Sequence, residues 1–112
     1  MNYSAQTLFN KISRHLLKQN KRAVVADGCV CYDEKSGRRC AVGCLMTLNY
    51  YKKNKDFSVS RIIHKLNLHS YSVLLLELQH CHDGESPYLW PRRLRAIARK
   101  FGLQIPEFLA AK

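Results

Sequence analysis

Four of the five cysteines of this chain lie within sixteen residues, as Cys29, Cys31, Cys40 and Cys44. Four thiolates are the number that a closed tetrahedral zinc site uses. If residues 40 to 44 are helical, Cys40 and Cys44 lie one turn apart on the same face. Cys29 and Cys31 fit less well, because paired zinc ligands usually have about two to four residues between them. A zinc-stabilised interaction domain is therefore one alternative for this chain.

Cys40 is also a candidate nucleophile, because it follows two arginines and begins a predicted helix. Both features lower the pKa of a thiol. His82 and Asp83 are residue types that supply a base and a group that orients it, so a small thiol enzyme is a second alternative. Cys40 and Cys44 also suit a core, since the segment CAVGCLM carries no charge and free cysteine is often buried. We favour this last interpretation and expect no catalytic residues and no cofactor.

The segment LQHCHDG places two histidines near the end of a predicted helix. His80 and His82 flank Cys81, so on a helix they point to different sides and cannot serve one site with it. Gln79 shares a face with His82 or with Asp83. A histidine near a helix C-terminus gains from the helix dipole, and we expect that structural role here.

The charge of the chain is strongly positive, with 19 Lys and Arg against 8 Asp and Glu and a formal net charge of +11. Such a field attracts nucleic acid, nucleoprotein or acidic protein surfaces. Arginine suits bidentate contacts with phosphate or carboxylate. The candidate contact residues share a helical spacing with almost no acids between them. They are Lys11, Arg14, Lys18 and Arg22 on or just after the first predicted helix, and Arg92, Arg93, Arg95, Arg99 and Lys100 on the last.

Apolar spacing predicts about five helices. Ser4 caps the first, which runs to about residue 20, and Ser58 caps one over residues 59–66; the others cover residues 40–53, 69–84 and 91–102. In the fourth helix, Val73, Leu74, Leu76 and Leu78 are expected to be apolar core positions.

Turn residues follow the first predicted helix. Asp27-Gly28 predicts a hairpin, and Gly37 marks a second turn that adds a further strand. The sequence therefore predicts one α+β domain over residues 1–112, with a small antiparallel hairpin or three-stranded sheet inserted after the first helix.

Two segments carry a resemblance to a family of small phage- and prophage-encoded proteins. These proteins have an opening helix, a hairpin with cysteine and tyrosine, a CAVGCL motif and a Leu-rich helix that ends in LQ, two residues and HD. The matching residues are Tyr32, Gly37, Cys40, Ala41, Val42, Gly43, Cys44 and Leu45, then Leu78, Gln79, His82 and Asp83. The resemblance covers the chain to about residue 100, although this chain is more basic than many members. It implies a phage origin, and by analogy of class an antagonist of host defence of the anti-CRISPR or anti-restriction type.

The remaining expectations concern location. The start of the chain lacks an unbroken apolar leader segment, and no stretch has the length of a membrane span. Five cysteines, an odd number, suit a reducing compartment. We expect a cytoplasmic binding protein, in the host cytosol if phage-encoded, that acts without catalysis and does not contact membranes.

Overall fold

The computed structural model describes residues 3–25, 28–53 and 58–111, with the backbone alone at residues 25, 28 and 29. Its α-helices are α1 (Ala5–Gln19), α2 (Leu48–Lys53), α3 (Val59–Lys65), α4 (Ser72–Gly84), α5 (Trp90–Lys100) and α6 (Glu107–Ala110). Three short 3-10 helices join them, namely η1 (Val42–Leu45), η2 (His69–Tyr71) and η3 (Pro87–Leu89).

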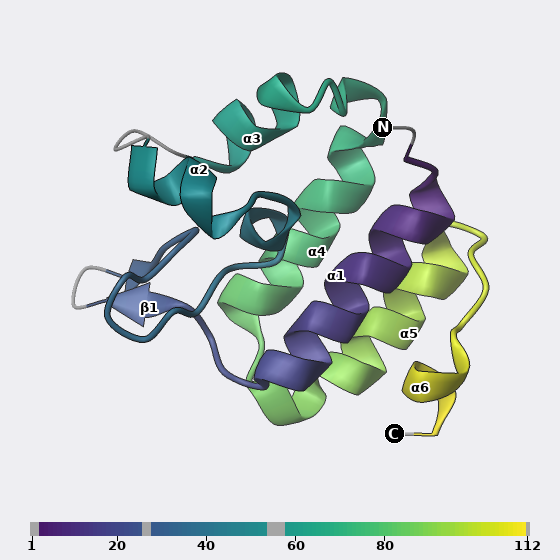
Figure 1. Ribbon diagram of the computed structural model, residues 1–112. Helices are drawn as coiled ribbons and strands as arrows, with labels where there is room; N and C mark the ends of the chain where they lie inside the picture. The colour runs from purple at the N-terminus through teal and green to yellow at the C-terminus, as the bar shows by residue number, and fades with distance from the viewer. Residues whose placement is uncertain (1–2, 26–27, 54–57, 112) are drawn as a thin grey trace.

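The core lies between α1, α4 and α5, which run side by side (Figure 1). Phe9, Leu75, Leu78, Trp90 and Leu94 are fully buried there. The turn η1 packs against α1, α3 and α4, whereas α6 lies against α1 and α5. One face of α1 is therefore used for packing, and the opposite face is left to solvent.

The prediction of an α+β fold is wrong, because the described part of the chain is an all-α globule. The predicted hairpin is reduced to β1 (Val24–Val25) paired with β2 (Gly28–Cys29), two residues each. Gly28 pairs with Val25 and is not a turn residue, and residues 26–27 lie outside the description. The predicted third strand amounts to one bridge between Tyr32 and Arg39. Pairs this short cannot form a sheet layer, so the core lies between the helices and the segment around η1.

The single helix predicted over residues 40–53 is also wrong. The chain forms η1, extends at Met46 (φ −105°, ψ 153°) and restarts as α2, where Thr47 Oγ1 accepts the N–H of Tyr50 at 3.2 Å. At the break, the Gly43 carbonyl accepts the N–H of Met46 at 3.3 Å, which closes η1, and the Tyr51 hydroxyl at 2.6 Å, so it is not available to the N–H four residues on that an α-helix would use. Leu48, the first residue of α2, is exposed.

The other helices are confirmed, with shifts at their ends. Ser4 caps α1 and Ser58 caps α3, as predicted. The last long helix begins at Trp90, one residue before the predicted start, and the preceding residues form η3 and not a loop. In α4 the predicted core positions Val73 and Leu76 are 66% and 46% exposed, because the buried side of the helix centres on its neighbours Leu74, Leu75 and Leu78.

Candidate nucleic-acid interface

The exposed face of α1 carries cations at helical spacing. The cap at Ser4 fixes its start, since Thr7 N–H donates to Ser4 Oγ at 3.1 Å and Ser4 N–H donates to Thr7 Oγ1 at 2.8 Å. Burial of Leu8, Phe9, Ile12 and Leu16 then orients the helix. The opposite face carries the predicted contact residues Lys11, Arg14 and Lys18, all exposed. The sequence of α1 contains no acidic residue, so this face is uniformly positive.

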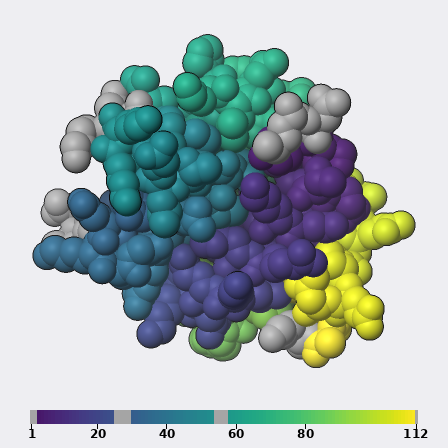
Figure 2. Space-filling model, in the orientation of Figure 1, coloured from purple at the N-terminus to yellow at the C-terminus, as the bar shows by residue number. Residues whose placement is uncertain are grey.

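A polar hollow of about 410 Å³ adjoins the C-terminal end of this face. It lies between the last turns of α1 and the loop of residues 36–39. Its lining residues are His15, Lys18, Gln19, Ser36, Gly37, Arg38 and Arg39. Figure 2 shows α1, in purple, crossing the front of the molecule between the blue segment that contains the loop of residues 36–39 and the yellow C-terminal tail.

Hydrogen bonds fix the walls of the hollow. The side chain of Gln19 accepts the N–H of Arg39 at 2.9 Å and donates to the carbonyl of the same residue at 2.9 Å. That carbonyl also accepts His15 Nε2–H at 3.0 Å. On the loop side, Gly37 adopts the left-handed conformation (φ +75°) and its N–H donates to the Asp33 carbonyl at 2.8 Å. The loop is thereby fastened to α1.

The charge in the hollow comes from Lys18, Arg38 and Arg39. Burial lowers the pKa of His15 below its usual value, against the opposing effect of its hydrogen bond to the Arg39 carbonyl, so this imidazole is neutral near pH 7. Arg39 donates one of its guanidinium N–H groups to the Met46 carbonyl at 3.0 Å. Guanidinium groups carry five donors, so most of those on Arg39 and Arg38 remain available to an anion.

An aromatic ring lies beside the middle of the basic face. The guanidinium of Arg14 stacks over the ring of Phe108, 4.8 Å from the ring centre. Leu17, Lys18, Arg14 and Phe108 line a second hollow of about 220 Å³. The C-terminal segment therefore supplies an apolar and aromatic surface next to the cations of α1.

The structure places the other predicted contact residues elsewhere. Arg22 is half-buried and donates to the Asp83 carbonyl at 3.2 Å. On α5, Arg93 donates to Glu77 at 3.1 Å, and Lys100 pairs with the same carboxylate. Arg95 donates to the Leu109 carbonyl at 3.3 Å. Arg92 and Arg99 are exposed.

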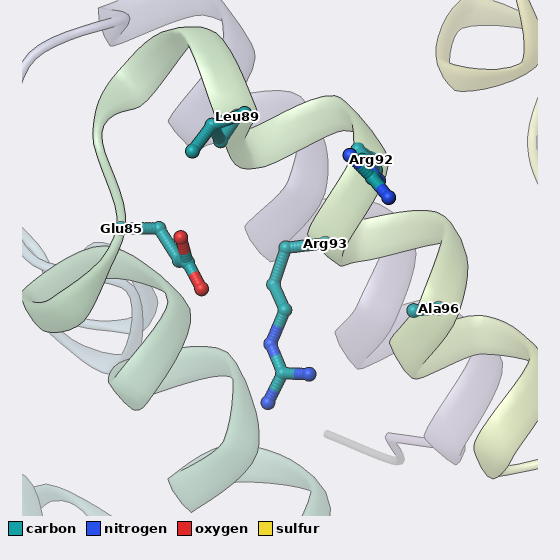
Figure 3. Close-up of a pocket in the computed structure, with 5 residues that line it drawn as sticks. All are labelled: Glu85, Leu89, Arg92, Arg93 and Ala96. Carbon is teal, nitrogen blue, oxygen red and sulfur yellow. The ribbon is translucent and has the colours of Figure 1, made fainter.

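A pocket of about 310 Å³ shows the mixed charge on this side. Glu85, Leu89, Arg92, Arg93 and Ala96 line it. In Figure 3, Glu85 and Arg93 extend toward the same space, whereas Arg92 leaves α5 in another direction. Because carboxylates stand among its arginines, the α5 face is less suited than α1 to a polyanion.

His82, the candidate base, lies in the core, and Asp83, the group that would orient it, is partly exposed and hydrogen-bonded to it. His82 is fully buried, and its Nδ1–H donates to Asp83 at 2.7 Å. Its Nε2 accepts the N–H of Ala23 at 3.0 Å, so neither ring nitrogen is available to a thiol. The His82 ring also stacks on Trp90, at 5.8 Å between centres. This arrangement supports a structural role.

Cys40, the candidate nucleophile, is fully buried. A nucleophile would need to be accessible to its substrate. A hydrogen bond with Cys31, together with burial, raises the pKa of Cys40 well above the usual thiol range. The same hydrogen bond lowers the pKa of Cys31, which is half-buried. Burial raises the pKa of Cys44 to about 12. The geometry thus opposes thiol chemistry at Cys40.

The zinc alternative rests on Cys29, Cys31, Cys40 and Cys44. Within the described residues, no three His, Cys, Asp or Glu side chains converge as metal ligands would. The side chain of Cys29 lies outside the description, so the four-thiol site stays a prediction.

The sequence did not identify the residues that complete the basic surface. Arg38 and Arg39 share no helical spacing with Lys18, and their adjacency to it depends on the loop pairing with Gln19. Phe108 follows the last predicted helix, and no local pattern indicates that it reaches α1.

Comparisons with family models, with curated proteins and with solved structures found no match to this chain. The resemblance to phage-encoded proteins, and the antagonism of host defence that it implies, therefore stay predictions. Among the described residues, none of the helices combines the length and apolar character needed to cross a membrane.

Proposed function

We propose that this protein binds nucleic acid through its phosphate backbone, without catalysis, using the basic face of α1 and the adjoining hollow. One observation carries the proposal: an exposed, acid-free helix face runs directly into a hollow lined by further cations. Lys18 belongs to both, so the two form one continuous positive surface. We call it the α1 surface, formed by Lys11, Arg14, Lys18, Arg38 and Arg39.

The spacing of these cations suits a chain of phosphates. A helix rises about 1.5 Å per residue, so Lys11 and Lys18 are about 10 Å apart along α1. Phosphates advance about 3.4 Å per nucleotide along one strand of a stacked duplex and farther along an extended single strand, so this span covers about two or three of them. The hollow then offers Arg38 and Arg39 to the next phosphate in the row.

The neighbouring ring favours nucleic acid over an acidic protein as the partner. A base or sugar beside the bound phosphates would meet Phe108, Leu17 and the stacked guanidinium of Arg14. Aromatic and guanidinium faces are the surfaces on which unpaired bases stack. A groove of cations with a ring beside it is the arrangement that single-strand binding sites use.

The experiment measures the affinity for a fluorescein-labelled single-stranded DNA 20-mer by anisotropy, as a function of NaCl concentration. Three to four phosphate contacts predict a log–log slope of roughly −2 to −3, at about −0.7 per contact on a single strand. Lys18→Gln removes one phosphate contact, so it should make the slope shallower by about 0.7. It should also weaken binding equally on DNA of unrelated sequence.

Lys65→Gln is the matched control, because it removes the same charge from an exposed lysine on α3 and should leave the slope unchanged. Equal effects of the two substitutions would mean that net charge, and not the α1 surface, drives binding. An affinity that does not depend on salt, or no binding at low salt, would overturn the proposal.

A further inference from the structure

His64 and His69 form an exposed pair of imidazoles on the side of the molecule where α3 meets η2. Nδ1 of His64 and Nε2 of His69 are 3.3 Å apart. Their rings are inclined by 68°, with centres 5.5 Å apart. Neither the packing of the core nor the α1 surface uses this pair.

The two nitrogens are within reach of a long hydrogen bond, and their separation is also that of two ligands of one metal ion. Hydrogen bonds from N–H groups are usually about 2.7–3.2 Å long between heavy atoms, so 3.3 Å is long for one. Two nitrogens at about 2.05 Å from a tetrahedral ion lie about 3.3 Å from one another. The pair therefore has the spacing of two ligands of one ion.

The backbone between the two histidines is held rigidly. Asn67 adopts a left-handed conformation (φ 54°), and its N–H donates to the His64 carbonyl at 3.0 Å. Leu68 N–H donates to the Ile63 carbonyl at 2.9 Å, and both of these side chains are buried. These two bonds form a Schellman motif with its apolar contact. The imidazoles are consequently presented by a fixed turn and not by a loose loop.

We propose that His64 and His69 bind one late first-row divalent transition-metal ion. Neutral imidazole nitrogens suit zinc, copper, nickel and cobalt, whereas magnesium and calcium prefer oxygen ligands. Only two protein ligands are supplied, so the remaining positions are open to water or to a donor atom of a bound partner. This site does not depend on the proposed nucleic-acid binding.

Co²⁺ is the probe, because its visible absorption reports tetrahedral ligation and a thiolate-to-cobalt charge-transfer band would reveal binding to cysteine instead. The full chain, kept reduced with a non-chelating phosphine, is titrated with CoCl₂. We expect one ion per chain, visible bands and no thiolate band. His64→Asn and His69→Asn should each weaken binding by at least about tenfold, because each removes one of two ligands.

His80→Asn is the matched control, since His80 is an equally exposed histidine on α4 and should leave the affinity unchanged. Circular dichroism of each variant shows that it is folded. The proposal is overturned if either His64→Asn or His69→Asn leaves the affinity within about twofold, if His80→Asn reduces it equally, or if the thiolate band dominates. Absence of Co²⁺ binding at millimolar concentration would overturn it as well.

Discussion

Gly43 occupies a position in η1 where the surrounding atoms leave no room for a side chain. A Cβ atom there would lie 2.4 Å from the carbonyl oxygen of Cys31, 3.0 Å from the Tyr51 hydroxyl and 3.1 Å from the sulfur of Cys40. The first of these is a backbone atom, which cannot rotate away. The close approach also explains the hydrogen bonds from Gly43 N–H to Cys40 Sγ and from Tyr51 to the Gly43 carbonyl.

Gly43→Ala should therefore lower the free energy of unfolding by about 3 kcal/mol, the upper part of the range for overpacking. Urea unfolding followed by circular dichroism measures the effect. Gly84→Ala is the control, because no atom lies within 4 Å of the added Cβ and the residue ends α4. That variant should be neutral or slightly more stable. Equal stability of the two variants would contradict the close packing at η1.

The thiols should differ widely in reactivity. Cys31 is half-buried and its hydrogen bond with Cys40 lowers its pKa, whereas burial raises the pKa of Cys44 and Cys81 to about 12. Since the thiolate is the reactive form, iodoacetamide at pH 8 should modify Cys31 before the other three described thiols, Cys40 included.

Peptide mass spectrometry after timed alkylation identifies the modified position, with Cys29→Ser removing the fifth thiol. Alkylation under denaturant provides the reference in which all thiols react alike. Modification of Cys40 ahead of Cys31 in the folded chain would restore the case for a nucleophile at that position.

At the scale of elements, the end of α4 holds together segments that have little regular structure of their own. His82 accepts the N–H of Ala23 just before β1, and Gln79 accepts the N–H of Val42 at 3.1 Å. Gln79 also donates to Asp83 at 2.9 Å, which in turn fixes His82. The side chains of the LQ–HD pattern thus accept hydrogen bonds from backbone N–H groups next to a two-residue hairpin and in a 3-10 turn, neither of which is supported by a sheet or a long helix.

This bracing should make stability depend on pH. Burial lowers the pKa of His82, against the opposing effect of Asp83, and burial likewise lowers the pKa of His15. The unfolded chain then binds protons at these positions at a higher pH than the folded chain. The contribution of these two histidines to the free energy of unfolding is fully present above the unfolded pKa of about 6.5 and is lost as the pH falls below it. The urea concentration at the midpoint of unfolding should therefore decrease as the pH is lowered from about 7.5 to about 5.

His15→Gln tests the share of one histidine, because an amide N–H can still donate to the Arg39 carbonyl while the titrating group is gone. The pH dependence should become shallower in this variant, with the share of His82 remaining. Stability that rises on acidification, or a variant as steep as the parent, would show that other groups control the transition.

The elements differ in how far the sequence predicted them, and the reason is physical. The helices α1 and α5 carry their own amphipathic pattern, so their faces follow from spacing alone. Residues 23–25 and 28–46 do not, because their conformation depends on contacts from Gln19, Gln79 and His82, which lie elsewhere in the chain. Short apolar runs are compatible with strand or helix, and tertiary partners decided the outcome here.

The same distinction holds for the candidate site. The row of Lys11, Arg14 and Lys18 was predictable, since residues three and four apart share a helix face. The hollow was not, because Arg38 joins Lys18 only through a loop that pairs with α1. Likewise, the ion pairs of Arg93 and Lys100 with Glu77 depend on how α4 and α5 pack.

At the scale of the whole molecule, the excess of cations opposes compactness. The fold holds a formal net charge of +11 within a radius of gyration of 13.3 Å. The Debye length is about 8 Å at physiological ionic strength and longer in dilute buffer, so most of these charges repel one another at low salt. Unfolding separates them, and the repulsion therefore favours the unfolded chain.

Added NaCl should raise the Tm, because screening relieves this repulsion in the folded state. Between about 20 and 200 mM we expect an effect of the order of 1 kcal/mol, or about 4 °C for a chain of this size. A Lys11→Glu and Arg92→Glu double variant, which replaces two exposed cations outside the last turn of any helix by anions, should show a higher Tm at low salt and a smaller increase. Lys11→Arg keeps the charge and should behave as the parent chain does. A Tm that falls with NaCl would mean that attractive pairs such as Glu77 with Arg93 and Lys100 outweigh the repulsion. The cation excess would then impose little cost on folding, and the α1 surface would be a smaller perturbation of the molecule than its net charge indicates.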